Sequence, residues 1–273
     1  MTVCLSASQR AATERSGIES PSIATRENRE SACELKFMVP RHTAAQIREW
    51  ARNHLLPDGY GSGPAKDQYQ ITSIYFDTAN FDVFHRNGSF ARGKYRVRRY
   101  GSSGVVFLER KLRTKECLTK RRTSILLSDL ERLESPATGE EWPGRWFARR
   151  LAARQIRPVC QVGYERTARA AMTQLGPVRL TIDEALRATG VSSVQFSSVP
   201  GTAILPDYAI VEMKFTVTMP TMFKLVIEEF ALNPIRFSKY RFSAGALELA
   251  TATSPAPRAE ERNLGMGGPV HHA

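Results

Sequence analysis

Residues 94–113, KYRVRRYGSSGVVFLERKLR, decide the fold. The stretch reads as two β-strands, 94–100 and 105–113, joined by a short turn at 101–104. Side chains alternate between the two faces of a strand, so one face of this hairpin carries charges and the other carries apolar groups. The charged face has Lys94, Arg96, Arg98, Glu109, Lys111 and Arg113. The opposite face has Tyr95, Val97, Val106, Leu108 and Leu112.

Two arginines of the first strand point to a binding site. Arg96 and Arg98 lie about 7 Å apart on one face, and at an effective dielectric constant of about 20 they repel each other by about 2.4 kcal/mol. Solvent and salt would screen this repulsion if the two arginines were exposed. In a concave site the repulsion is screened less, and a bound anion is needed to balance it. We therefore expect the hairpin to form the floor of a site for a polyanion.

The composition is that of a globular protein with an excess of positive charge. Of 273 residues 42% are hydrophobic and 24% are charged, and 39 Lys and Arg against 27 Asp and Glu give a net charge of +12. Such an excess favours a partner that carries phosphate: nucleic acid, a nucleotide, an inorganic polyanion or an anionic membrane surface. The sequence has no P-loop, dinucleotide-binding or hydrolase motif.

Cysteine usage and hydropathy indicate the compartment. The four cysteines, Cys4, Cys33, Cys117 and Cys160, have neither the spacing of a zinc site nor that of a disulfide framework. No run approaches the roughly 20 apolar residues that cross a bilayer, so no transmembrane segment is expected. We expect a cytoplasmic protein.

The chain divides into one ordered domain and two flanking segments. Residues 1–31 are polar and lack sustained periodicity, and residues 252–273 are rich in Pro, Gly and Ala, so we expect a disordered leader and a disordered tail. Residues 32–251 form the domain. Helical stretches are expected at 43–56, 128–156, 220–232 and 238–250.

Charged and apolar residues alternate in further predicted strands. Their polar faces interleave basic and acidic residues, as in the pairs Glu34/Lys36, Glu109/Lys111 and Glu212/Lys214. Sheet surfaces in water with cross-strand ion pairs would explain any one strand. The same alternation in all the predicted strands indicates an α+β fold. We expect an antiparallel β-barrel tunnel with a charged lumen, whose apolar outer faces are covered by the four helices. Lysines and arginines in such a lumen suit phosphates, and its carboxylates suit Mn²⁺ or Mg²⁺.

Nine short segments, in order, carry a resemblance to a known family. They are ELKF (34–37), SIYFDT (73–78), KYRVRRY (94–100), FLERK (107–111), KRR (120–122), YERTA (164–168), RLTID (179–183), VEMKF (211–215) and FSKYR (237–241). Through them the chain resembles the VTC domain, the polyphosphate polymerase module of the triphosphate tunnel metalloenzyme (CYTH-like) superfamily. The resemblance spans most of the predicted domain, residues 32–251.

The resemblance implies a fold, an activity and a set of site residues. It implies a β-barrel tunnel that transfers the terminal phosphoryl group of ATP onto a growing inorganic polyphosphate chain with a divalent metal, Mn²⁺ or Mg²⁺. The implied catalytic residues are Lys36, Arg96, Arg98, Lys111 and Arg166. The implied phosphate contacts are Lys120, Tyr164, Lys214, Ser238 and Lys239. The implied metal-holding carboxylates are Glu212 and, in support, Glu109.

One departure from the superfamily pattern separates the alternatives. Tunnel triphosphatases begin with E-x-E-x-K, and here the first glutamate position is Ala32, followed by Glu34 and Lys36. This favours a polymerase, an ATP-polyphosphate phosphotransferase, over a triphosphatase. A non-catalytic polyphosphate-binding module is the other alternative. The expected partners are ATP and inorganic polyphosphate rather than nucleic acid, and a membrane partner stays open.

Overall fold

The hairpin predicted from residues 94–113 is present in the structure. The structure, a computed structural model, describes residues 26–29, 33–113, 118–134 and 141–250. Strand β5 (Gly93–Tyr100) pairs antiparallel with β6 (Val105–Arg113), with Arg96 opposite Glu109. Gly101 opens the connecting turn at a φ of +50°, a backbone conformation that glycine adopts without steric cost.

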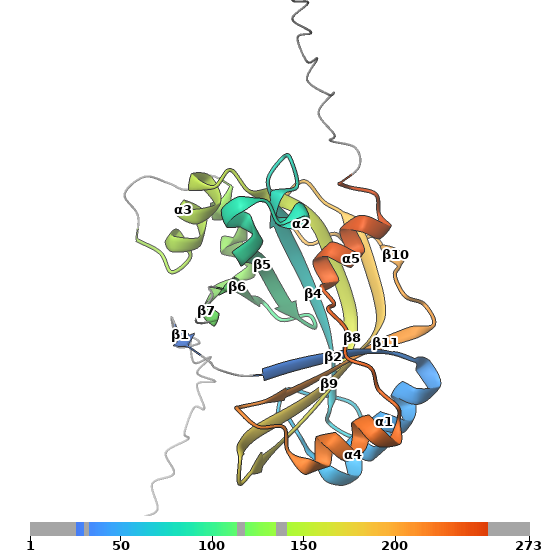
Figure 1. The fold of residues 1–273 in the computed structure, drawn as a ribbon. Helices are drawn as coiled ribbons and strands as arrows, with labels where there is room; N and C mark the ends of the chain where they lie inside the picture. Colours follow the sequence, from blue (N-terminus) through green and yellow to red (C-terminus); the bar gives the residue numbers. More distant parts are fainter. Residues whose placement is uncertain (1–25, 30–32, 114–117, 135–140, 251–273) are drawn as a thin grey trace, which may run out of the picture.

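The hairpin belongs to an 11-stranded sheet in which all the pairings are antiparallel. Its main path runs β1-β7-β6-β5-β4-β8-β9-β11-β2, and the short strands β10 and β3 pair with β9 and β8 (Figure 1). The other strands are β1 (Arg26–Arg29), β2 (Cys33–Pro40), β3 (Leu56–Pro57), β4 (Gln68–Asp77), β7 (Leu118–Leu126), β8 (Arg157–Thr173), β9 (Gly176–Gly190), β10 (Thr202–Ala203) and β11 (Tyr208–Phe215). Between β4 and β5 lie the short helix α2 (Asp82–His85) and the 3₁₀ turn η1 (Gly88–Arg92).

The sheet curls strongly but is not closed into a barrel. Five strands separate β2 from β6 along the path, a separation of roughly 29 Å if the sheet were flat. Yet Nζ of Lys111 in β6 lies 3.5 Å from Oε2 of Glu34 in β2. The predicted antiparallel α+β fold is confirmed. The predicted closure is wrong, because within the described residues the path ends at β1 and β2, which do not pair with each other.

The predicted leader and tail fall mostly outside the described residues. Within the leader, residues 26–29 form β1 and pair with β7, which their composition did not indicate. The rest of the leader and residues 252–273 lie outside the described part of the chain.

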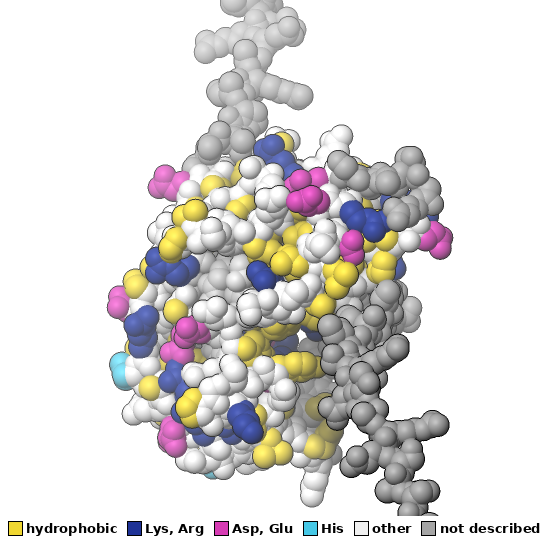
Figure 2. Space-filling view, turned by 180° about the vertical axis from the view of Figure 1, so that it is seen from behind, with side chains coloured by type: hydrophobic (Ala, Val, Ile, Leu, Met, Phe, Trp, Pro, Cys, Tyr) yellow, Lys and Arg dark blue, Asp and Glu magenta, His cyan; other side chains and the backbone are white. Residues whose placement is uncertain are grey.

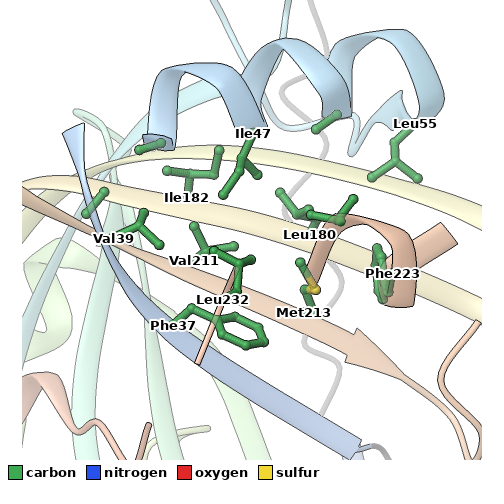
Figure 3. Packing of buried hydrophobic residues seen from close by; sticks show 14 of the residues in the cluster. Phe37, Val39, Ile47, Leu55, Leu180, Ile182, Val211, Met213, Phe223 and Leu232 are labelled. Carbon is green, nitrogen blue, oxygen red and sulfur yellow. The ribbon is translucent and has the colours of Figure 1, made fainter. Parts of the chain in front are cut away.

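Two helices cover the apolar side of β2, β9 and β11. Helix α1 (Arg41–His54) follows β2 directly and packs with α4 (Thr221–Glu229) against these strands (Figure 3). The strands contribute Phe37, Val39, Leu180, Ile182, Val211 and Met213 to this core. Because Phe37 is buried on this side, the alternating Lys36 must point to the other face.

A second core covers the apolar side of the hairpin. It lies beneath α3 (Arg145–Ala153) and the 3₁₀ turn η2 (Leu127–Leu133), which together replace the helical stretch predicted at 128–156. Phe147 of α3 approaches the rings of Phe76 and Tyr95 edge-on, with centroids 5.7 and 5.9 Å away. This burial confirms the predicted apolar face of the hairpin.

One helix packs on the charged side of the sheet, contrary to the expectation for residues 238–250. Tyr75 of β4 and Arg96 of β5 are register partners, so their side chains share a face. Tyr240 of α5 (Lys239–Ala246) stacks on Tyr75 with ring centroids 5.5 Å apart, and its hydroxyl donates to Oδ2 of Asp77 at 2.5 Å. Figure 1 shows α5 lying over β8. A helical pattern does not say which face of a sheet receives the helix, so the predicted outer position of this helix is wrong.

Candidate functional site

All twelve predicted site residues lie on the curled inner side of the sheet or at the start of α5. Register places the strand residues on one face, and contacts across the sheet join it to Ser238 and Lys239. We call this surface the charged face. It comprises Glu34 and Lys36 of β2, Lys94, Arg96 and Arg98 of β5, Glu109 and Lys111 of β6, Lys120 of β7, Tyr164 and Arg166 of β8, Asp183 of β9, Glu212 and Lys214 of β11, and Ser238 and Lys239.

Two E-x-K segments meet at one part of the charged face. Strands β2 and β11 run antiparallel, with Lys36 opposite Glu212 and Lys214 opposite Glu34. Lys214 Nζ lies 3.0 Å from Glu212 Oε1 and 3.6 Å from Glu34 Oε2. Lys36 Nζ lies 3.5 Å from Glu212 Oε2 and also pairs with Glu34. Glu34 was not among the predicted site residues, because its match to Lys214 depends on the pairing of β2 with β11.

These ion pairs keep both carboxylates ionised. Burial would raise the pKa of Glu212, but Lys214 and Lys36 outweigh it and hold that pKa well below its usual range. Burial and the neighbouring Glu212 would raise the pKa of Glu34, yet the surrounding lysines lower it on balance. Burial alone would lower the pKa of Lys36, and the same two carboxylates raise it. All three groups are therefore charged at neutral pH.

A second cluster surrounds Glu109, which is only 3% exposed. Its Oε2 accepts a hydrogen bond from Nε of Arg96 at 2.5 Å, and its Oε1 lies 3.4 Å from Nε of Arg122. Burial raises the pKa of Glu109, but the nearby arginines and Lys120 hold it well below its usual range. Arg98 instead donates to hydroxyl oxygens, Ser73 Oγ at 3.3 Å and Tyr164 Oη at 3.4 Å.

A third cluster joins β8, β9 and the start of α5. Arg166 donates to Oδ1 and Oδ2 of Asp183 at 2.6 and 2.8 Å, and Nζ of Lys239 lies 2.5 Å from Oδ2. Asp183 is fully buried, and the ring of Tyr164 lies 5.4 Å from the guanidinium of Arg166 and 4.8 Å from Nζ of Lys239. Asp183 was not among the predicted site residues, although it shares its strand face with Thr181 and Arg179.

The remaining predicted residues lie between these clusters. Lys111 pairs with Glu34 and is the register partner of Lys120. Burial lowers the pKa of both lysines below that of a free side chain. Ser238 caps α5 by accepting a hydrogen bond from the backbone N–H of Arg241 at 3.4 Å.

The carboxylates differ in whether they suit a divalent cation. Glu34 and Glu212 share Lys36 and Lys214 as partners, so their oxygens face the same space. Glu109 lies in the arginine cluster instead. Within the described residues there is no group of three or more His, Cys, Asp or Glu side chains placed to hold a metal. Mg²⁺ is commonly bound by one or two carboxylates together with substrate phosphates, so Glu34 and Glu212 fit a cation that arrives with a phosphorylated substrate.

The outer surface has a different distribution of charge. Figure 2 shows one face, on which the basic side chains of the described residues are scattered and acidic side chains lie between them. No helix in the described ranges is both long and apolar enough to cross a membrane.

Comparisons with known proteins give one family and several distant structures. The model of the VTC domain family matches residues 31–247. None of the curated proteins matches the sequence. A candidate adenylate cyclase from Bacillus halodurans is 13% identical, with a TM-score of 0.47 over 78% of this chain and 95% of that chain.

Two further solved structures are similarly distant. A protein from Pyrococcus horikoshii OT3 is 14% identical, with a TM-score of 0.44 over 81% of this chain and 99% of that chain. A candidate adenylyl cyclase from Hippeastrum, described as having a dominant triphosphatase activity, is 14% identical, with a TM-score of 0.43 over 82% of this chain and 97% of that chain.

Proposed function

The chain belongs to the VTC domain family, and on this basis we propose that it is a polyphosphate polymerase. The proposed reaction transfers the terminal phosphoryl group of ATP onto a growing chain of inorganic polyphosphate and releases ADP. The observation that carries the proposal is the charged face, on which lysines and arginines from β2, β5, β6, β8 and β11 converge. A linear chain of phosphates is the substrate that matches a row of cations spread over several strands.

Each kind of basic side chain has its own proposed role. Arg96, Arg98 and Arg166 would bind phosphate oxygens through their planar guanidinium groups. Arg98 is the most available of the three, because it donates hydrogen bonds to the neutral hydroxyls of Ser73 and Tyr164 rather than to a carboxylate. Lys36, Lys111 and Lys239 would act as point charges. Further phosphate contacts would come from Lys120, Tyr164, Lys214 and Ser238.

The proposed chemistry needs positioning and charge neutralisation rather than a strong base. A terminal oxygen of the polyphosphate chain forms a bond to the γ-phosphorus of ATP, the bond to the β,γ-bridging oxygen breaks, and ADP leaves with the electron pair. The attacking oxygen is already anionic, so no proton has to be removed from it. The transition state spreads negative charge over the phosphoryl oxygens, which fixed cations stabilise without reorganisation.

The acidic residues divide between two proposed roles. Glu212, with Glu34 beside it, would hold Mn²⁺ or Mg²⁺. A bound cation of this kind supplies charge neutralisation at the transferred phosphoryl group. The contacts of Glu109 with Arg96 and Arg122 favour a role in holding these guanidinium groups in place.

The test is an incubation of the purified protein with ATP and Mn²⁺, with the products separated by length on a gel. A ladder of long polyphosphate chains with release of ADP is the expected result. Free phosphate without chains would replace the proposal with a triphosphatase. Binding of added polyphosphate without consumption of ATP would replace it with a binding module.

A matched pair of variants connects the activity to the charged face. Arg98→Ala removes a guanidinium from this face and should abolish chain synthesis. Arg99→Ala is the control, because Arg99 alternates to the opposite side of β5 and donates to the carbonyl oxygens of Ser102 and Ser103. If both variants still synthesise polyphosphate, the activity does not depend on the charged face.

A further inference from the structure

Lys94 lies on the charged face but was not among the predicted site residues. It precedes Arg96 by two positions on β5, and its register partner on β6 is Lys111. Its Nζ donates a hydrogen bond to Oγ of Ser238 at 3.0 Å. The side chain is accessible to solvent, as expected for a residue that lines an open face. A substrate lying along the charged face could therefore reach it.

The charges that act most strongly on Lys94 are all positive. The charged groups with the largest effect on it are Lys36 of β2, Lys111 of β6, Arg96 of β5 and Arg86, which follows α2. Within the described residues no carboxylate forms an ion pair with Lys94. By contrast, Lys36, Lys111, Lys214 and Lys239 each have a carboxylate oxygen within ion-pair distance. Lys120 has no such ion pair among the described residues, but the charge with the largest effect on it is the carboxylate of Glu109.

Two effects lower the pKa of the ammonium group of Lys94 to about 8. The larger is partial desolvation by the surrounding strands, although part of the side chain stays in contact with solvent, and the second is repulsion by the neighbouring cations. While no anion is bound, the repulsion between Lys94 and the neighbouring cations is unfavourable. An incoming anion would remove that repulsion.

We propose that Lys94 is a further phosphate-binding residue, for which a phosphate group of the polyanionic substrate serves as the counter-ion. This inference rests on the proposed function, because it takes phosphate chains as the substrate class. Ser238 supports the assignment. Its oxygen accepts hydrogen bonds from Lys94 and from the backbone N–H of Arg241, so its own hydroxyl hydrogen is the group it can offer to a phosphate oxygen.

The proposal predicts how binding changes with pH. Protonated Lys94 attracts phosphate and neutral Lys94 does not, so affinity should fall as the pH rises through the pKa of the free protein, about 8. Lys111 also has a lowered pKa and contributes to any such fall. An arginine at position 94 stays charged throughout this range. The difference between the wild type and Lys94→Arg therefore isolates the contribution of Lys94.

The experiment is calorimetric titration of the protein with tripolyphosphate, in the presence of a chelator so that no turnover occurs. It compares wild type, Lys94→Arg and Lys94→Met from about pH 7 to about pH 9, on either side of the Lys94 pKa. At the lower pH, Lys94→Met should bind at least about tenfold more weakly than the wild type, the effect of one lost charge-assisted hydrogen bond. At the higher pH, the wild type should weaken toward Lys94→Met, while Lys94→Arg should keep its advantage.

Thermal unfolding gives an independent readout. Because Lys94→Met removes repulsion from the site, that variant should unfold at the same temperature as the wild type or a higher one. A purely structural lysine would give a lower unfolding temperature and no difference in the pH profile of binding.

The outcomes separate this inference from the proposed function. Equal affinity of the wild type and Lys94→Met at the lower pH, or the same pH profile in the wild type and Lys94→Arg, would overturn the role of Lys94 while leaving polyanion binding intact. Failure of the wild type to bind tripolyphosphate at all would overturn the proposed function and this inference together.

Discussion

Replacing Asp183 by Asn should be costly, because the carboxylate is fully buried between two cations. Arg166 donates to both of its oxygens at 2.6 and 2.8 Å, and Lys239 Nζ lies 2.5 Å from Oδ2. An amide cannot balance these charges, and breaking a buried ion pair in this way costs about 3–5 kcal/mol. In a domain of this size about 1 kcal/mol lowers the melting temperature by about 2–4 °C, so a decrease of roughly 6–20 °C is expected at neutral pH.

The cost should depend on pH in a defined direction. Burial raises the pKa of Asp183, but Arg166 and Lys239 outweigh it and leave the pKa below its usual range. The folded state therefore binds fewer protons at this carboxyl than the unfolded state does. The advantage of the wild type over Asp183→Asn should be complete above the ordinary Asp pKa of about 3.9 and should be lost as the pH falls below it.

The neighbouring residue provides the matched control. Glu184 points to the opposite side of β9 and pairs with Arg48, and the two side chains retain 22% and 19% exposure. Such a partly exposed pair contributes about 0–1 kcal/mol. Thermal melts monitored by circular dichroism would compare Glu184→Gln with Asp183→Asn. If Asp183→Asn melts as high as Glu184→Gln at neutral pH, the carboxylate of Asp183 does not balance the charges of Arg166 and Lys239.

Three further substitutions test other parts of the charged face and its support. Arg96→Ala should weaken tripolyphosphate binding at least about tenfold, measured by calorimetry, because one charged donor is lost; unchanged affinity would contradict its placement among the phosphate ligands. Glu212→Gln should lower metal-dependent kcat by about 100-fold or more. It should leave metal-free polyphosphate affinity equal or higher, because a negative charge is removed, and weaker binding would argue against its proposed role. Tyr240→Phe removes the 2.5 Å hydrogen bond to the buried Asp77, whose carboxylate still accepts from three backbone N–H groups. It should cost about 1.5–3 kcal/mol in a denaturant titration, the range for a hydrogen bond to a charged group; a smaller loss would show that α5 does not depend on this contact.

The faces of the strands could be predicted from the sequence, because the two-residue period of a strand leaves little choice once the apolar side is recognised. In the hairpin this placed Arg96 and Arg98 on one side, and Tyr95 and Val97 are buried on the other. The same two-residue alternation places the basic residues of the other strands on the face opposite their apolar residues. Once helices cover the apolar faces of the strands, the charged residues must lie together on the other side of the sheet.

Partners across strands could not be predicted in the same way, because they depend on register. Glu109 was expected beside the metal, but its position opposite Arg96 and Arg122 places it in an arginine cluster. Glu34 lies next to Glu212 because β2 pairs with β11, a contact between residues far apart in the chain.

Closure of the sheet and the position of α5 depend on tertiary packing. The alternation within each strand is the same in a closed barrel and in a strongly curled open sheet. The helical pattern around Tyr240 was recognised, but only the stacking on Tyr75 and the hydrogen bond to Asp77 place the helix on the charged side.

A crystal structure of the protein with bound tripolyphosphate would show directly whether the charged face binds a chain of phosphates. We expect phosphate oxygens within hydrogen-bond distance of Arg96, Arg98 and Arg166. Tripolyphosphate bound instead to the arginines of α3 on the opposite side of the sheet, with the charged face unchanged, would contradict this expectation.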